Sequence, residues 1–127
     1  MPQTILIIDD SPTIRNIIKV YLMGSQFEFM EAEGGEKGLE LVRKGSVELV
    51  IADINMPGMD GLTFVRQLRA DARPELRGIP VILLTGEKAE ALRIQGLKAG
   101  ANEFIRKPVS SAGLIEAVNK LLNAGAS

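Results

Sequence analysis

Short hydrophobic runs alternate along this chain with segments whose apolar residues recur at the spacing of a helix. Runs of a few Val, Leu, Ile and Ala residues that end at polar or turn residues are typical of strands buried on both faces. Two phenylalanines that enclose a polar residue predict a more exposed edge strand. The predicted strands are residues 5–8, a segment around Phe27 and Phe29, 47–52, 81–84 and a short strand near 102–106.

Helical spacing is clearest over residues 13–23, preceded by Ser11 and Pro12 in the positions of an N-cap and a first-turn proline. The apolar stripe of this helix consists of Ile14, Ile17, Ile18, Tyr21 and Leu22. Further helices are predicted around Leu39, Leu41 and Val42, from the capping residue Asp60 through Phe64, Val65 and Leu68, over roughly 88–99, and around Leu114, Ile115, Val118, Leu121 and Leu122. The stretch from Asp71 to Pro80 is interpreted as a surface connection.

Five strand–helix units in strict alternation predict an α/β fold, a doubly wound parallel sheet covered by helices on both faces. A chain of 127 residues fits one domain with its own core. We therefore expect one domain over residues 1–127 with no output domain after the last helix, and a frayed end over 123–127.

Composition excludes several classes of function. Formal net charge is −1 and the charges are dispersed, so neither nucleic acid nor an anionic membrane is expected as a partner. Cys and His are absent, which excludes disulfides, thiolate metal sites and histidine general bases. There is no signal-peptide pattern, and the apolar runs are far shorter than the roughly 20 residues of a membrane helix, so we expect a cytoplasmic protein.

Carboxylates follow two of the predicted buried strands. Asp9 and Asp10 come after 5–8, and Asp53 follows 47–52. In parallel α/β sheets the carboxyl ends of the strands form the ligand-binding edge, so these side chains are expected to converge. Three carboxylates repel one another unless a cation lies between them. An oxygen-only site with few protein ligands favours Mg²⁺.

Three further residues are ambiguous when taken alone. Thr85 follows the strand 81–84 and Lys107 follows the fifth strand. Thr at a strand end is ordinarily structural, and Lys is ordinarily a solvated surface charge. Phe104 by itself is better interpreted as a packing residue. Together with the acidic cluster, however, the hydroxyl and the ammonium group suit a site that receives a phosphoryl group.

The order of these residues resembles that of the receiver domains of two-component response regulators, over essentially the whole chain. The matching segments are Asp9-Asp10, Asp53, Met56-Pro57-Gly58-Met59-Asp60-Gly61, Thr85-Gly86, Gly100-Ala101-Asn102-Glu103-Phe104 and Lys107-Pro108. The resemblance implies a flavodoxin-like, three-layer α/β/α fold with strand order 2-1-3-4-5. In this family the Lys-Pro peptide bond is typically cis.

The resemblance also implies a role for each matching residue. Asp53 would accept a phosphoryl group from a histidine kinase or a phosphotransfer protein. Asp10, Asp53 and the backbone carbonyl of Asn55 would bind Mg²⁺, with Asp9 assisting. Such a protein promotes only its own phosphorylation and dephosphorylation, so it is not an enzyme that turns over a separate substrate.

Signal output would depend on two of the remaining residues. Thr85 and Lys107 would contact the phosphoryl oxygens, and Thr85 with Phe104 would form the switch. The face around the fourth and fifth predicted helices would bind a downstream protein effector. Asn55 and Glu87 would flank the approach of water to phosphorus, a pair that resembles fast-decaying chemotaxis members and predicts an acyl phosphate that lasts seconds to minutes.

Two alternatives and two departures from the family pattern accompany this interpretation. A haloacid dehalogenase-type phosphatase also uses Asp, Mg²⁺, Thr and Lys, but its second Asp is replaced here by Asn55, which cannot transfer a proton. A phosphorylation-independent pseudo-receiver is the other alternative. Phe104 lacks the hydroxyl of the family's frequent Tyr, and Gly38 stands where a helix former is expected, which predicts a second helix weaker by roughly 1 kcal/mol.

Overall fold

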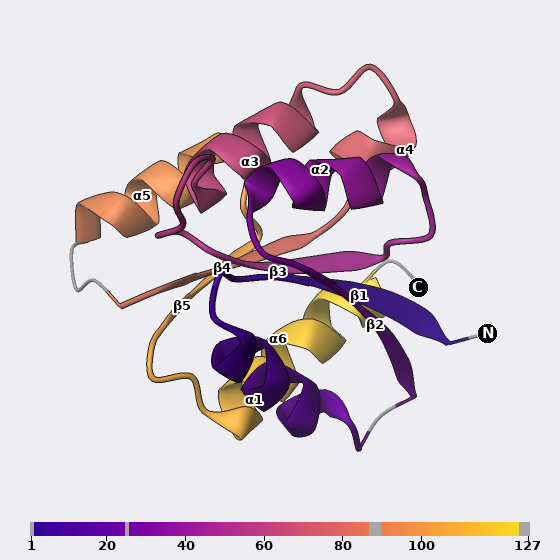
Figure 1. Cartoon of the computed structure of the whole chain (residues 1–127), viewed down its shortest axis with the longest axis vertical. Coiled ribbons are helices and arrows are strands. Elements are labelled where there is room, and N and C mark those ends of the chain that lie inside the picture. Colours follow the sequence, from indigo (N-terminus) through magenta and orange to yellow (C-terminus); the bar gives the residue numbers. More distant parts are fainter. Residues whose placement is uncertain (1, 25, 87–89, 125–127) are drawn as a thin grey trace.

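A single sheet of five parallel strands forms the centre of the molecule, in the order β2-β1-β3-β4-β5 (Figure 1). The computed structural model describes residues 2–24, 26–86 and 90–124. The strands are β1 (Gln3–Ile8), β2 (Phe27–Ala32), β3 (Leu49–Asp53), β4 (Val81–Thr85) and β5 (Glu103–Arg106). This order confirms the predicted fold, and β2 lies at an edge as the alternation of its phenylalanines predicted.

Helices cover both faces of the sheet. They are α1 (Pro12–Leu22), α2 (Gly35–Arg43), α3 (Gly61–Arg69), α4 (Pro74–Arg77), α5 (Glu90–Ala99) and α6 (Ser111–Ala124). Figure 1 shows α1 and α6 on one face and α2, α3 and α5 on the other. Two helices, α1 and α3, begin at the predicted caps: Ser11 Oγ accepts from the Ile14 N–H, and Asp60 Oδ1 accepts from the Thr63 N–H.

Alternation along the strands divides the core into two clusters. On the side of α2 and α3, Leu6, Val50 and Leu83 pack with Phe64. On the side of α1 and α6, the intervening strand residues pack with Ile18, Leu22, Leu114 and Val118. Every residue of β3 and β4 is buried, whereas β5 is only half-buried. The central strands therefore hold their ends rigidly, and the edge strand β5 is the less constrained one.

Two expectations about helices need correction. The stretch from Asp71 to Pro80 contains the one-turn helix α4, because Pro74 suits a first helical turn and Leu76 is buried beneath it. The fourth and fifth predicted helices are consequently α5 and α6. Gly38 is not a simple weakness of α2: a Cβ there would collide with the Ile8 side chain and lie 3.2 Å from the Phe64 ring. The small residue lets α2 approach the sheet.

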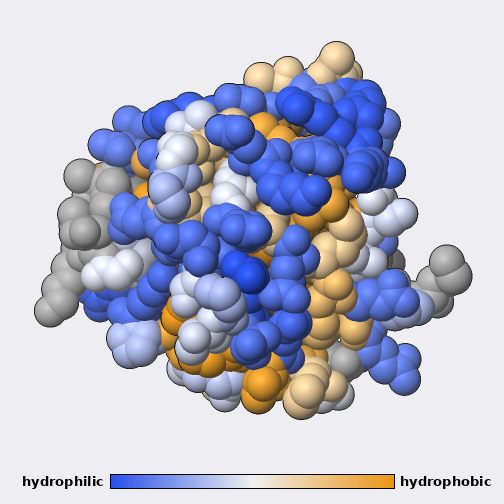
Figure 2. All heavy atoms as spheres, viewed as in Figure 1, coloured by the Kyte–Doolittle hydropathy of each residue, from blue (hydrophilic) through white to orange (hydrophobic). Residues whose placement is uncertain are grey.

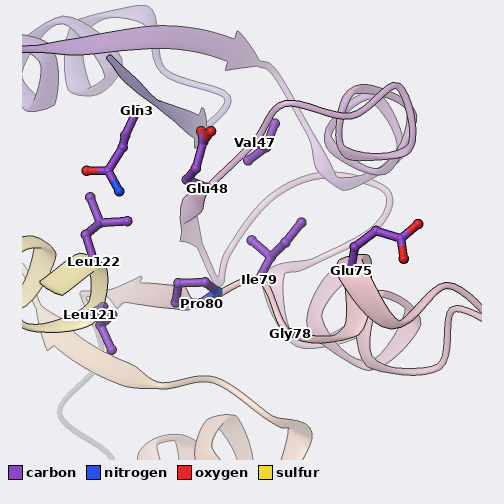
Figure 3. Close-up of a pocket in the computed structure, with 9 residues that line it drawn as sticks. All are labelled: Gln3, Val47, Glu48, Glu75, Gly78, Ile79, Pro80, Leu121 and Leu122. Atoms are coloured by element: carbon purple, nitrogen blue, oxygen red, sulfur yellow. The ribbon is translucent and has the colours of Figure 1, made fainter. Parts of the chain in front are cut away.

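A hollow of about 360 Å³ opens at the amino ends of the strands, between the start of β1, the segment before β4 and the end of α6 (Figure 3). Its lining is about equally polar and apolar, and the apolar part includes Val47, Ile79 and Leu122. One of its two acidic residues, Glu48, already accepts a bond from the Thr4 N–H. The hollow therefore lies at the edge of the sheet opposite the predicted site and gathers none of the predicted site residues.

The surface is mostly hydrophilic in the view of Figure 2, with hydrophobic residues exposed low in the view, where α1 lies. The large apolar side chains exposed on α1 and at its C-cap are Ile17, Val20 and Met23. No helix in the described part of the chain has the length and apolar character needed to cross a bilayer.

Candidate functional site

Three carboxylates meet at the carboxyl edge of the sheet. Asp9 and Asp10 follow β1 and Asp53 ends the adjacent strand β3. One carboxylate oxygen of each lies within 4.8 Å of those of the other two. Asp9 and Asp53 are buried, whereas Asp10 is exposed. The predicted convergence of the carboxylates is thus confirmed, and the cluster opens to solvent on the side of Asp10.

Asp9 is the most constrained of the three. Its Oδ1 accepts a hydrogen bond from the Ser11 N–H at 2.9 Å, but its buried Oδ2 has no hydrogen-bond partner among the described residues. Burial raises the pKa of Asp9 above its ordinary value; the bond from Ser11 opposes this, and the negative charge of Asp53 adds to it. A buried carboxylate oxygen without a donor is a site that favours a cation.

Lys107 supplies the positive charge of the site. Its Nζ lies 3.1 Å from Asp53 Oδ2 and 3.7 Å from Asp9 Oδ2. Its backbone N–H donates to the Thr85 carbonyl at 2.7 Å, and the peptide bond to Pro108 is cis. The ends of β4 and β5 are therefore tied together beside the acidic cluster, with the ammonium group inside it.

The two predicted switch residues lie on neighbouring strands. Thr85 is fully buried and stands in register with Arg106, while Phe104 pairs with Leu83 two positions earlier. Phe104 is half-buried and packs against the core on the side of α5. A Cβ on Gly96 would lie 3.2 Å from the Phe104 ring, so α5 passes close to that ring. A change in the ring's position would therefore be felt by α5.

The pair predicted to control dephosphorylation is only partly within the described structure. Asn55 is exposed, and its backbone N–H donates to Asp53 Oδ1 at 3.3 Å. It therefore lies next to the predicted acceptor. Glu87 falls outside the described residues.

Three residues that the sequence interpretation did not single out for this site also shape it. Ser11 was predicted only as a cap, yet its N–H also bonds Asp9. The Arg15 guanidinium donates to the Asp9 backbone carbonyl at 2.6 Å. A Cβ on Gly61 would lie 2.5 Å from the Asp53 carbonyl oxygen, so glycine lets α3 begin against the backbone of Asp53. The sequence signal that could have identified Arg15 is its spacing: it lies one helical turn after the cap Ser11, where a long side chain can reach back to the strand ends.

Comparison with known proteins places the chain in a family. Residues 5–119 match the model of the response regulator receiver domain. The chain is 38% identical over 118 residues to the chemotaxis protein CheY-3 of Vibrio cholerae, covering 92% of this chain and 89% of that protein. It is 35% identical over 118 residues to the transcriptional regulatory protein ResD of Bacillus subtilis, covering 93% of this chain but only 47% of ResD.

A solved structure agrees with these sequence matches. A putative response regulator from Chloroflexus aurantiacus superposes with a TM-score of 0.90 at 31% identity, covering 97% of this chain and 99% of that one. The chain belongs to the receiver-domain family. Receiver domains are signalling switches of two-component systems, and response regulators interact with histidine kinases and downstream effectors.

Receiver domains bind Mg²⁺ at an acidic cluster, and the residues present here fit such an ion. The side chains of the cluster are all carboxylates, and oxygen donors suit a hard cation. The orphaned oxygen of Asp9 lacks a partner that a cation would supply. The exposed side at Asp10 leaves room for water, which Mg²⁺ usually retains.

Proposed function

We propose that this receiver domain is a phosphorylation-dependent switch in which Asp53 accepts a phosphoryl group from a histidine kinase or a phosphotransfer protein. The observation that carries the proposal is the position of Lys107 Nζ, 3.1 Å from Asp53 Oδ2 within a cluster of three carboxylates. The arrangement sets a nucleophilic oxygen beside a fixed cation at the open edge of the sheet.

Transfer would begin with attack of an Asp53 carboxylate oxygen on phosphorus, in line with the bond from phosphorus to the donor's histidine nitrogen. As the new oxygen–phosphorus bond forms, that nitrogen leaves with the bonding electrons. Lys107 neutralises charge that develops on the transferring oxygens, and the Asn55 N–H holds the other Asp53 oxygen. Catalysis in such a site is positioning and electrostatic stabilisation, with no proton to be removed from the nucleophile.

Asp10, Asp53 and the Asn55 carbonyl would hold Mg²⁺, with Asp9 assisting. When bound, the ion supplies positive charge that offsets repulsion between the carboxylates and the incoming phosphoryl group. The protein would promote its own phosphorylation and dephosphorylation only.

The state of Asp53 would be communicated through Thr85 and Phe104. Thr85 ends β4, the strand next to β3, and its carbonyl accepts a hydrogen bond from the Lys107 N–H. Phosphoryl oxygens on Asp53 would attract both the Thr85 hydroxyl and the Lys107 ammonium group. They would therefore act on two residues that are already bonded to each other. The half-buried Phe104 ring would then shift by packing alone, since it has no hydroxyl. We place the effector-binding face around α5 and α6, where Ile94 and Leu97 are exposed.

Two alternatives are weighed against this function. Membership of the receiver family, together with Asn55 in place of a second Asp, argues against a dehalogenase-type phosphatase. A pseudo-receiver would keep the fold without the chemistry, and it makes the opposite prediction in the experiment that follows.

Incubation with acetyl phosphate and Mg²⁺, followed by intact mass measurement, tests the assignment. We expect one phosphate adduct in the parent and none in Asp53→Asn or in the presence of a chelator. Removal of the donor should be followed by loss of the adduct within seconds to minutes, more slowly in Asn55→Arg. An unmodified parent would support the pseudo-receiver, and an adduct that persists in Asp53→Asn would move the acceptor elsewhere.

A further inference from the structure

Arg15, in the second turn of α1, reaches back to the acidic cluster without being part of it. Its Nη1 donates to the backbone carbonyl of Asp9 at 2.6 Å, and its Nε donates to Glu31 Oε1 at 2.9 Å. The side chain is only 14% exposed, which is low for an arginine. One guanidinium therefore joins α1, the loop after β1 and the end of β2.

Asp9 is fixed from three directions. Its N–H donates to the Ala32 carbonyl at 3.1 Å, its Oδ1 accepts from Ser11, and its carbonyl accepts from Arg15. The carbonyl of Asp9 and the N–H of Asp10 belong to one planar peptide group. A donor that orients this carbonyl therefore also sets the direction in which Asp10 leaves the strand.

Arg15 is itself held by Glu31. The second oxygen of Glu31 accepts from Lys19 Nζ at 2.8 Å, so one carboxylate receives two cations from α1. The bonds from Lys19 and Arg15 lower the pKa of Glu31, which keeps it ionised. Lys19 touches the same carboxylate as Arg15 but has no bond to Asp9 among the described contacts, and this difference makes it a matched control.

We propose that Arg15 is a positioning residue for the cation site: it holds the Asp9–Asp10 peptide in the orientation in which both carboxylates face Asp53, and Glu31 holds Arg15. The proposal rests on the proposed function, because the divalent cation is part of it. Arg15 acts through the peptide, so its removal should weaken cation binding while the nucleophile and Lys107 stay in place.

The test is a Mg²⁺ titration of the unphosphorylated protein, followed by the amide NMR signals of Asp9, Asp10 and Asp53. Arg15→Met keeps the aliphatic stem and should weaken Mg²⁺ binding by about tenfold, the scale of losing a residue that orients a metal ligand. Lys19→Met should bind like the parent. Arg15→Lys and Glu31→Gln, which keep part of the contact, should lie between, and they carry the test if Arg15→Met does not fold.

Phosphorylation by acetyl phosphate provides a second readout. In Arg15→Met the Mg²⁺ concentration for half-maximal rate should rise, while the rate at saturating Mg²⁺ stays near that of the parent. Binding as tight as the parent's in Arg15→Met, or an equal loss in Lys19→Met, would overturn the proposal.

Failure of the proposed function would look different. A parent that binds Mg²⁺ at these carboxylates but is never phosphorylated would contradict the proposed function, and the titration would still decide the role of Arg15. A parent that binds no Mg²⁺ there would overturn both.

Discussion

Asp9 illustrates, at the scale of one residue, how the site sets stability against function. Its Oδ2 is buried without a hydrogen-bond donor, and the nearest cation, Lys107 Nζ, is 3.7 Å away. Leaving a buried polar atom unsatisfied costs free energy of folding. A cation that binds this oxygen would offset that cost. The metal-free protein should therefore be less stable than a variant that lacks this unsatisfied carboxylate oxygen.

Asp9→Asn should stabilise the protein in a chelator at neutral pH by about 1 kcal/mol, as substitutions that relieve functional strain commonly do. Because the pKa of Asp9 is raised in the folded state, its favourable contribution belongs to the protonated form and is lost as pH rises through the folded pKa. The difference from the parent should thus be small near pH 4, about the pKa of an unfolded Asp, and grow toward neutral pH.

Urea denaturation across this pH range measures the effect. Added Mg²⁺ should reverse the order, because binding to the folded state stabilises the parent more than the variant. An Asp9→Asn variant that is less stable than the parent in chelator would show that the carboxylate contributes to folding through contacts with protein alone.

The carboxylates themselves were predictable from sequence because strand ends are readable from hydrophobic runs. Their unequal burial was not, since Asp9 and Asp10 are adjacent and chemically identical; the direction of each side chain depends on the Ser11 and Arg15 bonds. Lys107 was assigned to the site from its position after the fifth predicted strand and then from the family resemblance, but its direct bond to Asp53, 54 positions away in sequence, is seen only in the structure.

At the scale of elements, the close approach of a helix to a strand explains two glycines that helix propensity alone could not explain. The N-terminus of α3 lies against the backbone of Asp53, so that a Cβ on Gly61 would be 2.5 Å from the Asp53 carbonyl oxygen and 2.9 Å from the Ile54 Cα. Gly38 plays the same part where α2 meets β1. The sequence showed glycines and predicted turns or weakness, because the distance between two elements is not a local property.

Gly61→Ala should therefore lower the free energy of unfolding by about 1–3 kcal/mol, the usual cost of overpacking. The backbone on the other side cannot rotate away as a side chain would, so the end of β3 must shift and phosphorylation of Asp53 should slow. Denaturant unfolding and the acetyl phosphate reaction measure the two effects. Gly78→Ala is the control, because its Cβ would have only the Pro74 carbonyl oxygen nearby, at 3.7 Å. Phosphorylation at the parental rate in Gly61→Ala would show that the strand end tolerates displacement.

At the scale of the whole molecule, the two ends of the sheet have different tasks. Opposite the acidic cluster, the Arg69 guanidinium donates to the carbonyls of Gly100, Arg77 and Ile79 and to Asn102 Oδ1. These bonds connect α3 to the ends of α4 and α5 and to the start of β5. Burial lowers the pKa of Arg69, and the described residues place no carboxylate against it, yet its guanidinium donates hydrogen bonds to four acceptors. No local pattern predicted this connection.

Arg69→Met should destabilise the protein by about 2–3 kcal/mol, because three carbonyls and Asn102 Oδ1 lose a charged donor at once and two of these bonds are partly buried. The phosphorylation rate of the remaining folded protein should be unchanged, since the acidic cluster is at the other end of the strands. Arg66→Met is the control on the same helix, because the Arg66 side chain is exposed and has no hydrogen bond or ion pair with the described residues. Urea denaturation and the acetyl phosphate rate separate the two properties, and a slower reaction in Arg69→Met would show that the ends are coupled.

The position of β5 has a consequence for how such a domain diversifies. The proposed phosphoryl acceptor lies on β3, a strand with neighbours on both sides and no exposed residue, while the ring proposed to report its state lies on a half-buried strand with one neighbour. Substitutions on the outer surface of α5 and α6 need not disturb a single atom of the acidic cluster. New effector partners can thus be acquired while the acidic cluster stays unchanged. Among the relatives of this chain, one is a chemotaxis protein and another a transcriptional regulatory protein.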